Sequence, residues 1–147
     1  MKKVQLITDG ACIGNPGPGG WACVIRFGEH KKEVWGSEKH TTNNRMELKA
    51  AIEGLAALKE KCEVQITTDS QYVMKGITEW IHGWKRKGWV TASKQPVVNK
   101  DLWMDLEMQT ERHQTSWAWT KGHASHVDNN RCDELATAAA RDQSSGG

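Results

Sequence analysis

The first third of the chain alternates apolar with polar residues in the way that β-strands require. Strands are predicted over residues 4–9, 21–27 and 32–37, and a loop short enough for a hairpin separates the last two. Residues 14–20 are rich in glycine and proline, which predicts a tight reversal after the first strand. This part of the chain should therefore form an antiparallel meander.

Helical spacing replaces this alternation after residue 43. Leu48, Ala51, Ile52, Leu55 and Leu58 recur on one face and predict a helix over residues 44–61. The elements predicted after it are a strand at 64–69, helical segments at 72–84 and 101–111, a strand at 116–120 and a helix at 129–141. This order predicts a single α/β domain over residues 1–142, followed by a disordered tail at residues 143–147.

The composition narrows the class of protein. The four cysteines show no C-x-x-C pair and no zinc-like spacing, which argues against a metal ribbon or a disulfide scaffold and fits a reducing compartment. No segment approaches the ~20 apolar residues of a membrane span, and the N-terminus lacks the apolar region of an export signal. We therefore expect a cytoplasmic protein that does not associate with membranes.

The charge is unevenly distributed. Residues 75–100 hold six lysines and arginines against the single acid Glu79, so this segment carries +5 although the whole chain carries only +2. A basic segment on a mildly acidic body predicts an anionic partner that binds at a defined place.

Two of the predicted strands end in the same way. Val4-Gln5-Leu6-Ile7-Thr8-Asp9 and Val64-Gln65-Ile66-Thr67-Thr68-Asp69 share the pattern Val-Gln-x-x-Thr-Asp. If the helix between them is a right-handed crossover, the strands lie parallel and adjacent, and Asp9 and Asp69 come about 5 Å apart. Two ionised carboxylates that close repel each other unless a divalent cation lies between them. The pair therefore indicates a site for a hard metal ion, although either Asp alone could simply begin a turn.

Two further acids have competing interpretations. Asn44-Arg45-Met46-Glu47 resembles a capping box, in which Glu47 would reach back to the amide of Asn44. Asp133 lies beside an apolar stripe early in the last helix, where a carboxylate interacts favourably with the helix dipole or is plain surface charge. Each acid is a candidate metal ligand only in combination with the Asp pair.

Four motifs in order and spacing resemble the signature of the ribonuclease H family. They are Thr8-Asp9-Gly10, Thr42-Asn43-Asn44-Arg45-Met46-Glu47, Thr68-Asp69-Ser70-Gln71-Tyr72 and Asn130-x-Cys132-Asp133-Glu134-Leu135-Ala136. The segment at residues 80–89 resembles the basic protrusion of the bacterial ribonuclease HI branch. The resemblance covers nearly the whole chain.

This resemblance implies a mixed five-stranded sheet flanked by helices on both faces, with Asp9 and Asp69 on neighbouring central strands. It implies an endonuclease that hydrolyses the RNA strand of RNA/DNA hybrids and leaves 5′-phosphate and 3′-hydroxyl ends. Asp9, Glu47, Asp69 and Asp133 would hold two Mg²⁺ ions with substrate bound, and Mn²⁺ could substitute. The family histidine that matches His123 would shuttle a proton or assist product release, although an isolated loop histidine is usually just exposed.

The resemblance also assigns residues to the two strands of the hybrid. The RNA strand, read through its 2′-hydroxyls, would meet Cys12, Asn15, Asn43, Asn44 and Gln71. The DNA strand would meet Thr42, Arg45, Asn99, Trp80, Trp84, Lys85, Arg86, Lys87 and Trp89. The alternatives are turn and cap chemistry for Asn15 and Asn44, core packing for the tryptophans and a solvated face for the basic run. Gln95 and Val98 stand where bacterial relatives often carry Lys, which would weaken the affinity for the hybrid.

Three rival functions are compatible with parts of this pattern. A catalytically silent hybrid-binding module should have lost one of the four acids, and a metal-free ribonuclease would need paired histidines. A DNA nuclease or integrase would share the strand-end Asp residues, but the amides beside them favour reading of 2′-hydroxyls. Residues 14–20 lack the Gly-Lys-Ser/Thr ending of a nucleotide P-loop. We expect a monomer with no obligatory protein partner.

Overall fold

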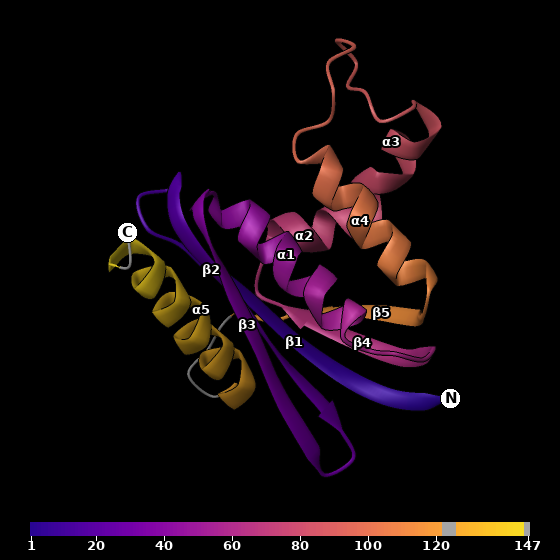
Figure 1. The fold of residues 1–147 in the computed structure, drawn as a ribbon. Coiled ribbons are helices and arrows are strands. Elements are labelled where there is room, and N and C mark those ends of the chain that lie inside the picture. Colours follow the sequence, from indigo (N-terminus) through magenta and orange to yellow (C-terminus); the bar gives the residue numbers. More distant parts are fainter. Residues whose placement is uncertain (122–125, 146–147) are drawn as a thin grey trace.

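A five-stranded mixed sheet forms the centre of the molecule in the computed structural model, which describes residues 1–121 and 126–145 (Figure 1). The strands are β1 (Lys2–Cys12), β2 (Gly17–Phe27), β3 (His30–Thr41), β4 (Cys62–Thr68) and β5 (Gln114–Trp119), in the order β3-β2-β1-β4-β5. β1, β2 and β3 pair antiparallel, whereas β4 lies parallel to both β1 and β5. The predicted mixed sheet is confirmed.

Helices cover both faces of this sheet. They are α1 (Asn43–Ala56), α2 (Gln71–Lys75), the π-helical turn η1 (Gly76–Trp80), α3 (Ile81–Arg86), α4 (Lys100–Glu111) and α5 (Val127–Ser145). In Figure 1, α5 lies alone on one face, and α1 and α4 lie on the other. None of the described helices is both long and apolar enough to cross a membrane.

The alternation of side chains along β1 supplies both faces of the sheet with core residues. Leu6 belongs to the larger core beneath α1 and α4, which also holds Leu48, Ile66 and Trp103. Its neighbour Ile7 belongs to a smaller core on the opposite face, with Ala22, Val24, Cys132 and Ala136. One strand therefore ties both layers together and fixes the position of the residue that ends its buried run, Asp9.

The boundaries of several predicted elements need correction. α1 ends at Ala56, earlier than predicted, where the chain turns through a bond from the amide of Leu58 to the carbonyl of Leu55. The stretch predicted as helical over residues 72–84 consists of three short pieces, because η1 interrupts it. α5 continues to Ser145, so residues 143–145 are helical instead of a disordered tail. The side chain of Gln143 donates to Ser37, and the hydroxyl of Ser145 donates to the carbonyl of Arg141.

Candidate active site

The parallel pairing of β1 with β4 brings Asp9 and Asp69 together. Thr8 lies opposite Thr68 in this register, so the next residues, Asp9 and Asp69, lie together just beyond the end of the β1–β4 pairing. Asp9 is 5% exposed and Asp69 is half-buried. Oxygen atoms of Asp9, Asp69 and Glu47 all lie within 4.8 Å of one another. The separation predicted from the repeated Val-Gln-x-x-Thr-Asp pattern is confirmed.

Glu47 joins this acid cluster (Asp9, Glu47 and Asp69) from α1. The N-cap of α1 is Thr42, whose hydroxyl accepts from the amide of Arg45 at 3.3 Å. The Glu47 carboxylate accepts from the amide of Gly10, and the same amide donates to Oδ1 of Asp9 at 2.9 Å. The capping-box alternative for Glu47 is therefore wrong, and its buried carboxylate faces Asp9.

Close contact between β1 and α1 at Gly10 makes this arrangement possible. A Cβ atom on Gly10 would lie 2.5 Å from the amide nitrogen of Glu47 and 2.6 Å from the carbonyl carbon of Met46. Both neighbours are backbone atoms and cannot move aside as a side chain could. Only glycine lets the strand and helix approach closely enough for one amide to serve two carboxylates.

Gly10→Ala is expected to lower the free energy of unfolding by about 1–3 kcal/mol, because the added methyl group forces α1 away from β1. Denaturant unfolding measures this change. Gly83→Ala in α3 is the matched control, since nothing lies within 4 Å of a Cβ at that position. The control should be neutral or slightly stabilising, because alanine favours a helix. Equal stability of the Gly10→Ala and wild-type proteins would contradict the close approach.

The electrostatics of the acid cluster favour a bound cation. Burial raises the pKa of Asp9 to about 7, and repulsion from Asp69 and Asp133 adds to the rise, while hydrogen bonds from Glu47 and Gly10 oppose it. Burial, followed by the charge of Asp9, raises the pKa of Glu47 well above its ordinary value. Asp9 and Glu47 therefore bind protons more readily than ordinary carboxyl groups do, and a positive charge between them would replace those protons. Carboxylate oxygens are the ligands that Mg²⁺ prefers, so the donor set fits this ion.

Asp133 approaches the acid cluster from the opposite face of the sheet. It is exposed on α5, outside the group of three carboxylates within 4.8 Å, yet its charge contributes to the raised pKa of Asp9. The thiol of the preceding Cys132 donates to the carbonyl of Ile7, two residues before Asp9, at 3.1 Å. His123, the predicted proton shuttle, lies outside the described residues, and its role stays a prediction.

The residues predicted to meet the RNA strand lie close in sequence to the three acids, on β1, the β1–β2 loop, α1 and α2. Oδ1 of Asn15 accepts from the amide of Asn43 at 2.9 Å, which joins the β1–β2 loop to the start of α1. The thiol of Cys12 donates to the carbonyls of Gly17 and Thr41 at 3.5 and 3.4 Å. Asn44 is exposed on the first turn of α1, and Gln71 begins α2, two residues after Asp69.

The predicted phosphate-binding residues also lie together. The guanidinium of Arg45 donates to Oδ1 of Asn99 at 3.2 Å, and Asn99 donates to the hydroxyl of Tyr72 at 3.1 Å. Arg45 also forms two bonds with Asp101, at 3.0 and 2.7 Å. Sequence reasoning missed Asp101, because an acid in the first turn of a helix has a local explanation in the helix dipole.

The basic protrusion, α3 with the loop that follows it, projects from the body in Figure 1. Trp84 and Trp89 pack against the larger core, as the core-packing alternative expects, and Trp84 lies 5.3 Å from Trp103 between ring centroids. Trp80 is 39% exposed. Lys85 forms an ion pair with Glu107 at 3.1 Å, whereas Arg86 and Lys87 are exposed.

Known proteins resemble the chain along almost its full length. Residues 1–141 match the family model described as RNase H. A ribonuclease H of Solibacter usitatus is 74% identical over 144 residues, which cover 98% of this chain and 99% of that protein. A ribonuclease HI of Neisseria meningitidis serogroup B is 61% identical over 139 residues, covering 95% of this chain and 96% of that protein.

Solved structures share the fold. LC9-RNase H1 superposes with a TM-score of 0.87 at 34% identity, over 97% of this chain and 74% of that chain. LC11-RNase H1, solved in complex with an RNA/DNA hybrid, superposes with a TM-score of 0.71 at 24% identity, over 94% of this chain and 96% of that chain. The buried acid cluster lies on this shared fold, and the chain belongs to the ribonuclease H family, in its bacterial ribonuclease HI branch.

Proposed function

We propose that this chain is an endonuclease that hydrolyses the RNA strand of RNA/DNA hybrids in a metal-dependent reaction and leaves 5′-phosphate and 3′-hydroxyl ends. The observation that carries the proposal is the gathering of Asp9, Glu47 and Asp69 within 4.8 Å, two of them buried. Without a cation, this arrangement costs desolvation and repulsion. A metal site for hydrolysis explains why the chain holds these carboxylates together despite that cost.

Asp9, Glu47, Asp69 and Asp133 are the proposed ligands of two Mg²⁺ ions, with Mn²⁺ as a substitute. When bound, the two ions lower the pKa of an attacking water and stabilise the charge that develops on the leaving 3′ oxygen. The chain supplies the alignment: the amide of Gly10 fixes Asp9 and Glu47 against each other, and burial keeps bulk water from both carboxylates. His123 is the proposed proton shuttle.

Selection of the hybrid is proposed to come from two groups of polar residues. Cys12, Asn15, Asn43, Asn44 and Gln71 would contact the RNA strand, where amides can read 2′-hydroxyls along the minor groove. Thr42, Arg45 and Asn99 would hold a phosphate of the DNA strand. Arg45 is then shared between this phosphate and Asp101, whose carboxylate lowers the net charge of the site before substrate binds.

A monomer in the cytoplasm is the proposed working form. The four cysteines Cys12, Cys23, Cys62 and Cys132 are all free thiols, and three of them are buried. Free thiols persist where glutathione and thioredoxin keep them reduced. Sedimentation of the purified protein tests the monomer.

The function is tested by incubating the protein with a hybrid, double-stranded RNA and double-stranded DNA of the same sequence, each with Mg²⁺ or with chelator. Cleavage of the hybrid alone, in Mg²⁺ alone, is expected. Cleavage of double-stranded DNA would favour the rival DNA nuclease, and cleavage in chelator would exclude the metal-dependent reaction.

A substrate with one ribonucleotide in otherwise duplex DNA is expected to be cut much more slowly than a continuous hybrid. Asn15 and Asn43 join the β1–β2 loop to the start of α1, whereas Gln71 begins α2, so the proposed footprint spans several successive 2′-hydroxyls. Initial rates on substrates with one to six ribonucleotides measure the effect. A rate that does not depend on the number of ribonucleotides would contradict this footprint.

A further inference from the structure

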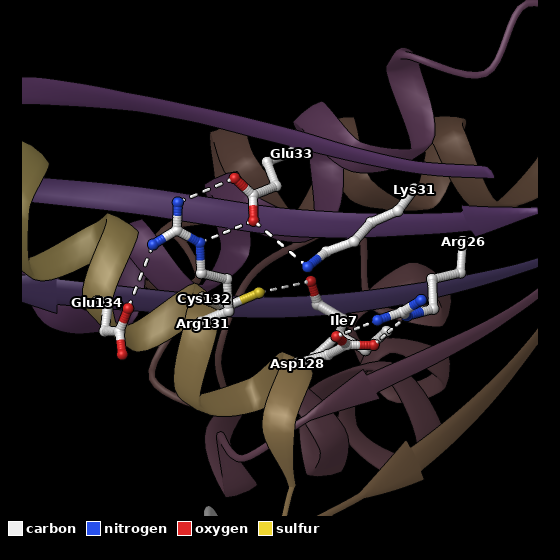
Figure 2. A network of polar contacts seen from close by, with 8 residues as sticks. All are labelled: Ile7, Arg26, Lys31, Glu33, Asp128, Arg131, Cys132 and Glu134. Carbon is white, nitrogen blue, oxygen red and sulfur yellow. Dashed lines mark hydrogen bonds and ion pairs between the residues drawn. The ribbon is translucent and has the colours of Figure 1, made fainter. Parts of the chain in front are cut away.

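The start of α5 is held to the sheet by a network of polar contacts (Figure 2). Nε and Nη2 of Arg131 donate to the two carboxylate oxygens of Glu33 on β3, at 2.7 and 3.1 Å. One turn earlier, Arg26 at the end of β2 forms a similar two-pronged pair with Asp128, in which Nη2 donates to Oδ1 at 2.8 Å. Both contacts lie within five residues of Asp133.

Cys132 lies between these contacts and faces the sheet. Its buried thiol donates to the carbonyl of Ile7 on β1 at 3.1 Å, and its side chain belongs to the core under α5 (Figure 2). Farther along α5 the backbones of the helix and of β2 lie so close together that a Cβ on Gly20 would be 2.2 Å from the carbonyl oxygen of Ala136. These two contacts fix the distance between α5 and the sheet.

The rotation of α5 about its own axis decides where the side chains on its two flanks point. Successive residues of an α-helix are about 100° apart, so Arg131 and Asp133 project from opposite flanks when Cys132 faces the sheet. The strand order β3-β2-β1-β4 places Glu33 on the flank of Arg131, and Asp9 and Asp69 on the flank of Asp133. The ion pair that holds Arg131 against β3 therefore also sets how closely the carboxylate of Asp133 approaches the acid cluster.

We propose that Glu33 and Arg131 are positioning residues that set the rotation of α5 and thereby hold Asp133 at the metal site. The inference rests on the role of Asp133 as a metal ligand under the proposed function. A second cation contacts the same carboxylate, because the ammonium of Lys31 lies 3.6 Å from Oε2 of Glu33. Glu134 binds the third nitrogen of the guanidinium at 3.2 Å and holds Arg131 from its own helix.

The partial exposure of the Arg131–Glu33 pair distinguishes this positioning role from a purely stabilising one. The side chains of Arg131 and Glu33 are 41% and 24% exposed. Ion pairs at such partly exposed sites contribute little to the free energy of unfolding. Loss of the pair should therefore alter metal binding far more than it alters the melting temperature.

The test compares Arg131→Ala and Glu33→Ala with Lys49→Ala, which breaks the Lys49–Glu53 pair on α1, a pair of similar exposure far from Asp133 in the sequence. Calorimetric titration of the substrate-free proteins with Mn²⁺ or Mg²⁺ is expected to show about tenfold weaker binding for the first two variants only, at the low end for groups that orient metal ligands. All three should melt within a few degrees of wild type, and Arg131→Lys should recover part of the loss.

A double-mutant cycle decides whether Arg131 acts through Asp133. Asp133→Asn alone should weaken metal binding, and adding Arg131→Ala should then change it no further. Unchanged metal binding in Arg131→Ala, or an equal loss with and without the Asp133 carboxylate, would overturn the positioning role. If Asp133→Asn alone leaves metal binding unchanged, the proposed ligand role of Asp133 fails first, and this inference fails with it.

Discussion

Asp9→Asn is expected to reduce hybrid cleavage to below about a hundredth of the wild-type rate, while the affinity for the hybrid stays nearly unchanged. The substitution keeps the size and the hydrogen-bonding reach of the side chain but removes a negative charge from the centre of the acid cluster, where two cations would be held. The basic protrusion that would bind the DNA strand is untouched. Turnover in Mg²⁺ and hybrid binding in chelator measure the two effects separately.

Asp105→Asn is the matched control, because Asp105 is an exposed carboxylate on α4. It should cleave the hybrid at the wild-type rate. Mg²⁺-dependent turnover of Asp9→Asn above about a hundredth of wild type would exclude the two-metal assignment.

The same substitution is expected to stabilise the chelated protein at neutral and alkaline pH. The folded-state pKa of Asp9 is raised to about 7 from an ordinary 3.8, mainly by burial, so the folded protein binds more protons than the unfolded chain between these values. The free energy of unfolding then falls as the pH rises through this window and levels off above about pH 7. The rise of this pKa from 3.8 to about 7 corresponds to about 4 kcal/mol as an upper bound, because Asp9 and Glu47 share the effect.

Denaturant unfolding in chelator at pH 4 and pH 8 measures this difference. Wild type and Asp9→Asn should be similar at pH 4, and the variant should be more stable at pH 8. Added Mg²⁺ should stabilise wild type at pH 8 and leave the variant nearly unchanged, because ligand binding stabilises only the protein that binds it. A variant less stable than wild type at pH 8 in chelator would contradict the raised pKa.

Local sequence patterns predicted the position of the Asp pair but left Glu47 undecided. The repeated Val-Gln-x-x-Thr-Asp pattern fixes both the strand and the phase of Asp9 and Asp69, and parallel pairing then brings them together. Glu47 satisfies a local capping rule equally well, and the choice depends on the amide of Gly10, 37 residues away in the sequence. Only the family resemblance could resolve it before the structure.

The features that sequence reasoning missed all depend on contacts between distant residues. Arg45 and Asp101 are 56 residues apart, and Glu33 and Arg131 are 98 residues apart, so no local periodicity reveals either pair. The interruption of the helix predicted over residues 72–84 accompanies a tertiary contact at its first π-helical residue. A Cβ on Gly76 would lie 2.0 Å from the ring of Trp103, so the chain passes unusually close to α4 there.

Neutralising Lys85, Arg86 and Lys87 together is expected to raise KM for the hybrid strongly while changing kcat little. Arg86 and Lys87 are exposed on the basic protrusion, far in sequence from the acid cluster, and would hold phosphates equally in the ground and transition states. Each lost phosphate contact should flatten the plot of log affinity against log salt concentration by about 0.7–0.9, so three contacts flatten it by roughly 2–3 units.

The contribution of Lys85 to phosphate binding can be tested separately, because its ammonium is already paired with Glu107. If this pair stays closed on the hybrid, an Arg86 and Lys87 double substitution should flatten the slope by about 1.4–1.8 units, and removal of Lys85 should add nothing. If the pair opens, the triple variant should exceed the double variant by about 0.7–0.9 units. Hybrid affinity of the Asp9→Asn form across a salt series distinguishes these outcomes without cleavage of the substrate.

Neutralising Lys3, Lys59 and Lys61 provides a control of equal charge. These exposed residues lie near the starts of β1 and β4, whereas Asp9 and Asp69 lie just beyond the other end of the β1–β4 pairing. Their removal lowers the net charge as much as the protrusion variant does, yet should leave the salt slope nearly unchanged, because the slope counts phosphates contacted and not total charge. Equal flattening of the salt slope by both triple variants would mean that the hybrid is attracted by net charge alone. An unchanged slope in the protrusion variant would mean that Lys85, Arg86 and Lys87 contact solvent and no phosphates.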